Sequence, residues 1–214
     1  MIAAPDLKIP HGEESRIWEA IATALEPRKL VPPSEWAEAN VILSKEQSPS
    51  RPGPFRCSFA PWTRAIHDLL YNNPRKKGWI LKKRAQIGIT RVVLNLMGCF
   101  CDTQPGPFLF LISNEKQAKY YAQKHFDKLV EGVPSLRASF KHGADEGGQT
   151  VLERPYRGGQ VDFAGSGSVA SVTSRSYVLV AIDEYDVFEQ MFSGGHAGDG
   201  FTLAEARTSA SPHL

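Results

Sequence analysis

The sequence has few cysteines and no long apolar run, and each shortage excludes a class of protein. Its three cysteines, Cys57, Cys99 and Cys101, are odd in number and lack the paired spacing of zinc ligands. This argues against a disulfide scaffold and favours a reducing compartment. The six histidines show no ligand spacing either. No stretch approaches the roughly 18 apolar residues that span a bilayer, and the N-terminus does not resemble a secretory signal. We therefore expect a cytoplasmic protein without a membrane partner.

Net charge is also small, at +2 in 214 residues, so the overall balance does not indicate a nucleic-acid-binding protein. The charges are nevertheless clustered. Six basic residues fall within ten positions: Arg75, Lys76, Lys77, Lys82, Lys83 and Arg84. Four acidic residues fall within seven positions: Asp183, Glu184, Asp186 and Glu189. The basic cluster fits the phosphates of a nucleotide, of DNA or of both, although a solvated face explains residues 75–77 at least as well.

The composition favours one sizeable globular domain, since 42% of the residues are hydrophobic and 22% are charged. Apolar spacing predicts helices at residues 15–25 and 34–40. Residues 44–56 are rich in Ser, Pro, Gly and Arg, which is typical of an irregular connection. We therefore divide the chain into a helical and loop-containing N-terminal lead, residues 1–54, and a domain of residues 55–214.

In the second part, apolar strands alternate with helices. The pattern predicts helices at residues 61–71, 90–100, 115–130 and 202–208. It predicts strands at residues 78–82, 108–112 and 177–182, and a hairpin within 147–165 whose strands contain 151–152 and 161–163. Continuous apolar strands separated by helices are typical of a sheet that is buried on both faces. The predicted fold class is therefore α/β, with a mostly parallel sheet flanked by helices.

Residues 83–90, Lys-Arg-Ala-Gln-Ile-Gly-Ile-Thr, resemble a phosphate-binding loop whose lysine stands at the wrong end. The standard loop is Gly, four residues, Gly, Lys and Ser or Thr. Gly88 matches its second glycine and Thr90 its magnesium-binding hydroxyl. Ile89 occupies the lysine position, and Lys83 occupies the first glycine position. Because the loop wraps around the phosphates, a lysine at its start can reach the same space. Taken alone, the stretch also fits a plain helix start.

A second motif is the apolar run 178–182, which is followed by Asp183 and Glu184. In P-loop ATPases an aspartate at such a strand end orients magnesium, and the next glutamate polarises the attacking water. Two adjacent carboxylates at the end of a buried strand are costly without a nearby cation. The alternative is a strand that leaves the core into an acidic loop. Because both motifs occur in the right order, we favour binding or hydrolysis of a nucleoside triphosphate.

The two motifs together resemble the ATPase domain of the large subunit of phage terminases, the GpA type of DNA-packaging motor. In that family the loop lysine is often displaced to the front, as in residues 83–90. The resemblance runs from about residue 33 to 209 and implies a P-loop NTPase of the ASCE type. Further stretches match the family in order: residues 36–40, 52–55, 61–70, 105–107, 158–159, 174–175, 178–186, 203–205 and 207–208.

The resemblance implies a motor that uses ATP and Mg²⁺ to move double-stranded DNA into a capsid, in the cytoplasm of the bacterial host. Its implied partners are DNA, the portal protein, the small terminase subunit and further copies in a ring. Thr90 and Asp183 would bind the metal, Glu184 would be catalytic, and Arg84 or Arg175 would stabilise charge. For Arg175 a salt bridge to a loop carboxylate is the alternative. The implied nucleotide-binding residues are Lys83, Arg84, Ala85, Gln86, Ile87, Gly88, Ile89, Thr90 and, near the adenine, Trp62.

The sequence departs from the family in two respects. Ser113 and Asn114 stand where the family usually has a Pro-Thr pair. The chain also ends before the coupling strand and the nuclease domain of the fuller family chain, so we expect an incomplete ATPase domain without DNA cleavage. Two other interpretations remain open. One is a non-catalytic nucleotide-binding or assembly module, which Ile89 favours, and the other is a helicase-like motor, for which the chain is short.

Overall fold

The computed structural model describes residues 16, 18, 30–73, 78–84, 86–145, 150–165 and 175–185. The chain divides into two units, Met1–Leu30 and Val31–Leu214. In the first unit the structure describes Arg16, Trp18 and Leu30, of which Arg16 and Trp18 are helical. The rest of the predicted helix at 15–25 lies outside the described residues, as does the predicted helix at 202–208. Within the part that the structure describes, no helix has the length and apolar character needed to cross a bilayer.

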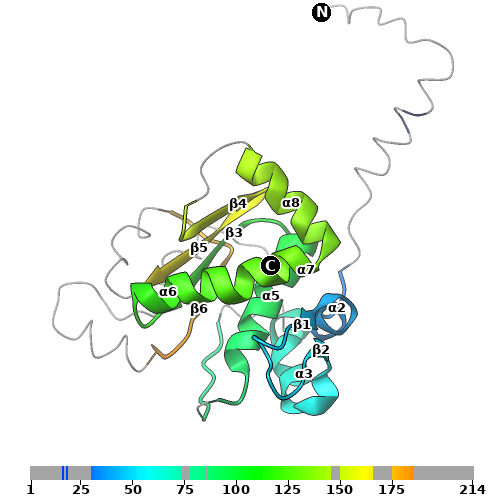
Figure 1. Cartoon of the computed structure of the whole chain (residues 1–214), viewed down its shortest axis with the longest axis vertical. Coiled ribbons are helices and arrows are strands. Elements are labelled where there is room, and N and C mark those ends of the chain that lie inside the picture. The colour runs from blue at the N-terminus through cyan, green and yellow to red at the C-terminus, as the bar shows by residue number, and fades with distance from the viewer. Residues whose placement is uncertain are drawn as a thin grey trace, which may run out of the picture. The chain divides into compact units, whose positions relative to one another are not determined.

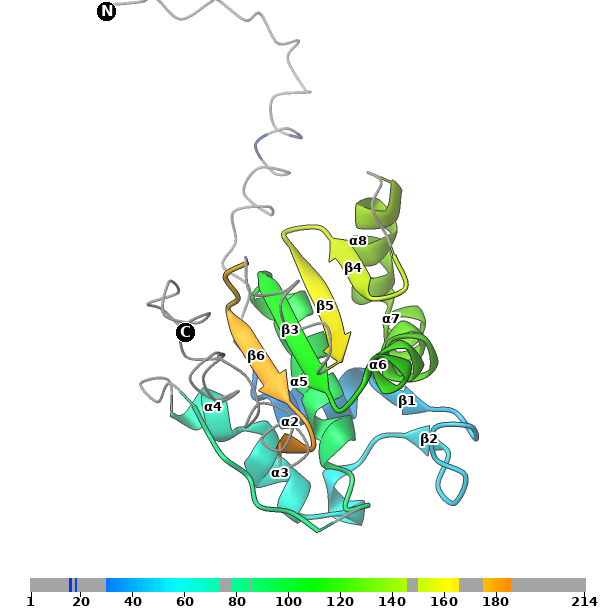
Figure 2. The ribbon, with the colours of Figure 1, turned by 90° about the vertical axis from the view of Figure 1, so that its left-hand side faces the viewer.

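Four strands form the central sheet of the second unit, in the order β4-β5-β3-β6 (Figure 2). The strands are β3 (Pro107–Ile112), β4 (Glu153–Tyr156), β5 (Gly159–Gly165) and β6 (Leu179–Ile182). β3 is parallel to both β5 and β6, whereas β4 is antiparallel to β5. The predicted hairpin is confirmed, although its first strand begins at Glu153 and not at Val151. The prediction of a mixed α/β fold with a mostly parallel sheet is therefore confirmed.

The central strand β3 is buried on both faces because its apolar run is continuous. Successive side chains of a strand point to opposite faces of the sheet. Phe108, Phe110 and Ile112 accordingly belong to the larger of two cores, and Leu109 and Leu111 belong to the smaller one. None of these five residues is more than 3% exposed. The apolar run predicted for residues 108–112 is therefore confirmed as a strand in the middle of the sheet.

Helices cover the face of the sheet that carries the larger core (Figure 1). The helical elements are α2 (Pro33–Asn40), η1 (Cys57–Phe59), α3 (Trp62–His67), α4 (Leu69–Asn72), α5 (Ile89–Thr103), α6 (Glu115–Tyr121), η2 (Ala122–Phe126), α7 (Asp127–Gly132) and α8 (Pro134–Asp145). The predicted helix at 90–100 is confirmed as α5. The one at 115–130 is confirmed as α6 and α7, which a π-helical turn, η2, joins. The one at 61–71 is confirmed with an interruption at Asp68. The sequence analysis did not predict α8.

The predicted helix at 34–40 is confirmed as α2, and it packs into the same core as the sheet. Trp36 is 4% exposed, and its indole Nε1 donates a hydrogen bond to Asp102 Oδ2 on α5 at 2.9 Å. The connection that follows α2 is irregular, as expected, apart from a short antiparallel ladder. The ladder joins β1 (Ile42–Leu43) to β2 (Gly53–Pro54). Residues 31–43 thus contribute to the core beside α5.

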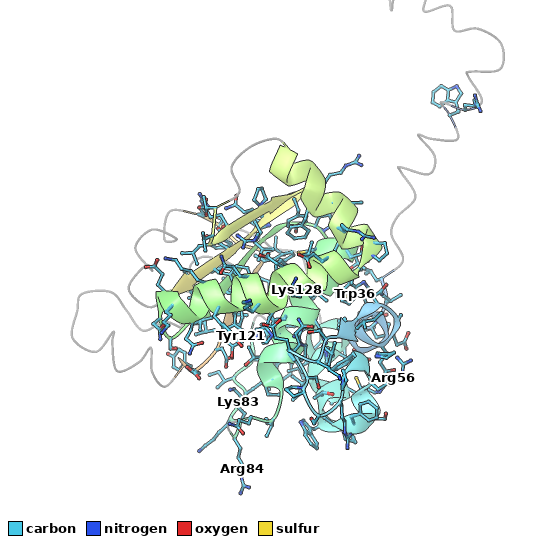
Figure 3. All side chains as sticks on the ribbon, in the orientation of Figure 1. Trp36, Arg56, Lys83, Arg84, Tyr121 and Lys128 are labelled. Carbon is cyan, nitrogen blue, oxygen red and sulfur yellow. The ribbon has the colours of Figure 1, made fainter. Side chains whose placement is uncertain are left out.

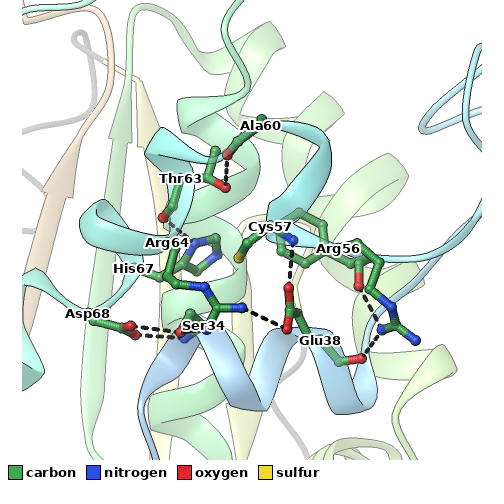
Figure 4. A network of polar contacts seen from close by, with 10 residues as sticks. Ser34, Glu38, Arg56, Cys57, Ala60, Thr63, Arg64, His67 and Asp68 are labelled. Atoms are coloured by element: carbon green, nitrogen blue, oxygen red, sulfur yellow. Dashed lines mark hydrogen bonds and ion pairs between the residues drawn. The ribbon is translucent and has the colours of Figure 1, made fainter.

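A polar network fastens α2 to the segment that contains α3 (Figure 4). Both carboxylate oxygens of Asp68 accept hydrogen bonds from Ser34, one from its backbone N–H at 2.9 Å and one from its hydroxyl at 2.7 Å. Asp68 therefore satisfies the first turn of α2, which has no side-chain cap of its own. Glu38 pairs with Arg64 at 3.0 Å and accepts the N–H of Cys57 at 2.7 Å.

The predicted strand at residues 78–82 is wrong. Residues 78–84 form neither a helix nor a strand. A strand needs a neighbouring backbone for its N–H and C=O groups. No strand of the described part of the chain pairs with this segment, so its apolar side chains stay accessible. Trp79 is 40% exposed, Ile80 80% and Leu81 42%.

Candidate functional site

The loop before α5 has a backbone conformation that few residues adopt. Gly88 is the N-cap of α5 at φ +84°, where a residue without Cβ avoids steric cost. Gln86 has φ +61°, which is strained for a residue with a side chain. Such strain concentrates at functional sites. Ile89, at the standard lysine position, is only 6% exposed. Ala85, which we predicted to bind nucleotide, lies outside the described residues.

The acidic pair lies where β6 ends. The backbone N–H of Asp183 donates to Leu111 O at 3.0 Å, so the ladder with β3 continues to this residue. Asp183 is 6% exposed, whereas its neighbour Glu184 is exposed. Glu184 has φ +57°, and its N–H donates to Asp183 Oδ1 at 3.0 Å. The two described non-glycine residues with positive φ, Gln86 and Glu184, therefore lie one in each of the two predicted motifs.

The fold brings the two motifs into contact, although they are far apart in the sequence. The ammonium of Lys83 lies 3.1 Å from Asp183 Oδ1. The hydroxyl of Thr90 donates a short hydrogen bond to Asp183 Oδ2. A buried carboxylate is stable only with such partners, because desolvation of an unpaired charge is expensive. Lys83, Thr90 and Asp183 thus form one polar cluster at the carboxyl end of β6.

The cluster contains oxygen ligands of the kind that Mg²⁺ uses. Within the described residues, no group of three or more His, Cys, Asp and Glu side chains could hold a metal by itself. Mg²⁺ does not require such a group, because it is usually held by one or two carboxylates together with waters and substrate phosphates. The Thr90 hydroxyl and the Asp183 carboxylate fit that pattern.

Trp62 lies beside the loop. Its indole Nε1 donates to the Ile87 carbonyl at 3.4 Å, and the residue is 52% exposed. An accessible aromatic ring next to a phosphate loop is suited to stack on a nucleotide base. Arg84 points away from the body of the domain, whereas Lys83 lies nearer to it (Figure 3).

The second candidate arginine, Arg175, is engaged elsewhere on the sheet. Its Nη1 lies 3.1 Å from Glu153 Oε1 and 3.1 Å from Asp162 Oδ2. Glu153 and Asp162 are direct partners across β4 and β5. Adjacent carboxylates on one sheet face repel each other, and Arg175 neutralises both. Hydrogen bonding to Asp162 raises the pKa of Arg175. Arg175 also precedes β6 in the chain, whereas Asp183 follows it, so the two residues lie towards opposite ends of this strand.

A buried cation that the sequence did not predict lies next to the loop. Arg91 follows Thr90, and its Nη2 donates to His125 Nδ1 at 3.1 Å, so His125 is the acceptor. Its Nη1 is buried without a partner among the described residues. Burial lowers the pKa of Arg91 to about 10. Burial, followed by the charge of Arg91, lowers the pKa of His125 to about 4. No periodicity in the sequence could indicate this pair, because the turn η2 places His125.

Tyr121, the last residue of α6, is a further neighbour that the sequence analysis missed. Its hydroxyl lies near the side chain of Thr90. Burial raises the pKa of Tyr121, and the negative charge of Asp183 adds to that effect. The ring lies 6.3 Å from that of Phe110 and 5.1 Å from that of His125, measured between centroids. Tyr121 therefore lines the site from the side of α6 (Figure 3).

Comparison with known proteins identifies the family. The sequence-family model for the ATPase domain of the phage terminase large subunit gpA matches residues 49–213, which is more than half of the chain. The chain therefore belongs to this family, and the resemblance seen in the sequence is confirmed. No curated protein and no solved structure matches the chain.

Proposed function

We propose that this chain is the ATPase motor domain of a DNA-packaging terminase and that it hydrolyses ATP at the cluster around Asp183. The observation that supports this most directly is the meeting of Lys83 and Thr90 on the Asp183 carboxylate. Lys83 and Thr90 do not follow the order of a standard phosphate loop, yet a lysine, a hydroxyl and a carboxylate meet here, and these are the groups that a P-loop site would use. The family adds that the domain is an ATPase.

Each residue then has a distinct task. Lys83 would bind the terminal phosphates, and the loop residues up to Gly88 would offer backbone N–H groups beside the positive end of α5. Thr90 and Asp183 would hold Mg²⁺, which would offset charge on the phosphate oxygens. Glu184 is exposed at the end of β6 and would accept a proton from the attacking water.

Two peripheral assignments follow from exposure and contacts. Trp62 would stack on the base. Of the two candidate arginines, Arg84 is the better suited to stabilise charge on a nucleotide, either in its own site or in that of a neighbouring subunit. Arg175 already neutralises Glu153 and Asp162, which supports a structural role.

The assembly proposed around this domain comes from the family. We propose the ASCE type of P-loop fold, a ring of copies in the bacterial host cytoplasm, and double-stranded DNA, the portal protein and the small terminase subunit as partners. The bounds of the N-terminal lead, residues 1–54, and of the ATPase domain, residues 55–214, remain predictions.

A titration with a non-hydrolysable ATP analogue and Mg²⁺ tests the loop assignment. Lys83→Ala should weaken binding by about 10- to 100-fold, because a charge-assisted phosphate contact contributes about 1.5–3 kcal/mol. Ile89→Ala is the matched control and should bind like the wild type, since a buried isoleucine makes no phosphate contact. Equal affinity in the two variants would overturn the assignment of Lys83.

Phosphate release distinguishes a motor from a non-catalytic module. Glu184→Gln should keep nucleotide affinity and lose turnover, because the amide cannot accept the proton of the attacking water. Ile89 at the standard lysine position favours the alternative, a module that binds nucleotide without hydrolysing it. If the wild type binds ATP but releases no phosphate with Mg²⁺ and DNA present, the module hypothesis is correct.

A further inference from the structure

We infer that Lys83 serves as the resident counter-ion of Asp183, so that the site rejects a free divalent cation and accepts the metal only as its complex with a nucleoside triphosphate. This inference rests on the proposed function and adds a rule for which form of the ligand can enter.

The Asp183 side chain is 7% exposed, and both of its oxygens are already engaged. Oδ1 accepts the N–H of Glu184 at 3.0 Å and lies 3.1 Å from the ammonium of Lys83. Oδ2 accepts the hydroxyl of Thr90. The two groups best suited to hold Mg²⁺, Thr90 and Asp183, are therefore bonded to each other, and a lysine supplies the positive charge.

A free cation meets two obstacles at such a site. It must approach next to an ammonium of like charge, and it must displace Lys83 from Asp183. The displaced lysine side chain is 28% exposed and would lose its ion-pair partner without gaining another. A metal–triphosphate complex removes both obstacles, because it brings a cation for Asp183 and an anion for Lys83 in one step.

The unusual position of the lysine makes this exchange of partners possible. In a standard loop the lysine belongs to the first turn of the helix. Lys83 belongs to residues 78–84, which form neither helix nor strand, so no ladder or helical hydrogen bonds hold its backbone in place. Lys83 can therefore move from carboxylate to phosphate without breaking secondary structure.

The test measures Mn²⁺ binding without nucleotide, by electron paramagnetic resonance, in the whole chain. Lys83→Met should bind Mn²⁺ at least tenfold more tightly than the wild type, because Asp183 has lost its resident cation. Lys82→Met changes the net charge equally at the adjacent exposed position and should bind like the wild type. Lys83→Arg keeps the cation and should also bind weakly. Equal affinities in Lys83→Met and Lys82→Met overturn the inference.

Thermal unfolding covers the case in which Lys83→Met folds poorly. The melting temperature of that variant should rise with added Mg²⁺, whereas that of Lys82→Met should not. Adding Asp183→Asn to Lys83→Met should abolish both the tight Mn²⁺ binding and the Mg²⁺-dependent rise. If the melting temperature of Lys83→Met does not change when Mg²⁺ is added, the inference is overturned.

These measurements separate the inference from the proposed function, because they use no nucleotide. If the wild type neither binds nor hydrolyses ATP but the metal affinities differ as expected, the proposed function fails and the role of Lys83 as counter-ion stands. If the wild type hydrolyses ATP and the variants bind Mn²⁺ equally, the proposed function stands and the inference fails.

Discussion

The pair Arg91–His125 should make the stability of the domain depend on pH. His125 has a folded-state pKa of about 4, against 6.5 for an unperturbed histidine, because it is half-buried and accepts a hydrogen bond from a cation. Between these two pKa values, His125 therefore binds a proton in the unfolded chain and not in the folded chain. The contribution of His125 to stability is complete above pH 6.5 and is lost as the pH falls towards 4.

The magnitude follows from the gap between the two pKa values. At about 1.4 kcal/mol per pH unit, a gap of about 2.5 units sets a ceiling of about 3.5 kcal/mol. Because His125 is only half-buried, solvent screening reduces the expected contribution to about 1–2 kcal/mol. Burial also lowers the pKa of His67, which adds a contribution of the same sign.

His125→Gln isolates the effect, because the glutamine oxygen can still accept from Arg91 but does not titrate. The free energy of unfolding is measured with urea at pH 7 and at pH 4.5 for the wild type and the variant. We expect the wild type to lose about 1–2 kcal/mol more than the variant over this range. His67 and the carboxylates titrate in both proteins and cancel in the comparison. Equal losses would refute the assignment of a depressed pKa to His125.

Two further substitutions test the loop and the sheet. Gly88→Ala should destabilise the domain by about 1 kcal/mol, because φ +84° is unfavourable for a residue with Cβ, and chemical denaturation measures this; an unchanged stability would contradict the left-handed cap. Arg175→Gln should lower the free energy of unfolding by about 1–3 kcal/mol, because Glu153 and Asp162 lose their shared cation. The loss should be smaller than for a fully buried ion pair, because Arg175 is half-exposed. ATP turnover per folded molecule should not change in Arg175→Gln, and a large loss of turnover at unchanged stability would instead assign Arg175 to the chemistry.

The sequence predicted those parts of the fold in which apolar periodicity and burial agree. Residues 108–112 were recognisable as a buried strand because every residue is apolar, and α5 because its apolar positions recur with helical spacing. The run at 78–82 was also predicted as a strand, from its three consecutive apolar residues 79–81, yet it forms none. A strand is defined by its neighbours, and no pattern within five residues reports whether a neighbouring backbone is present.

The site was predictable in its parts and not in its contacts. Lys83, Thr90 and Asp183 were selected from two local motifs, and the fold brings their side chains together. No sequence pattern indicated that Arg91 belongs to the site, because the π-helical turn η2 positions its partner His125. A turn of that kind depends on tertiary packing, and its sequence reads as ordinary helix.

The location of Ile89 explains why the lysine of this loop can stand at the front. Ile89 is the first residue of α5 and is 6% exposed, so the site occupied by a lysine in the standard loop is apolar and closed here. A lysine at that position would lose hydration without gaining a carboxylate, which is the costly arrangement for an ion. Lys83 avoids this cost because its ammonium reaches Asp183 from a segment outside α5 and its side chain remains 28% exposed. The displaced lysine is therefore consistent with the packing around it, and the role proposed for Lys83 does not require a lysine at position 89.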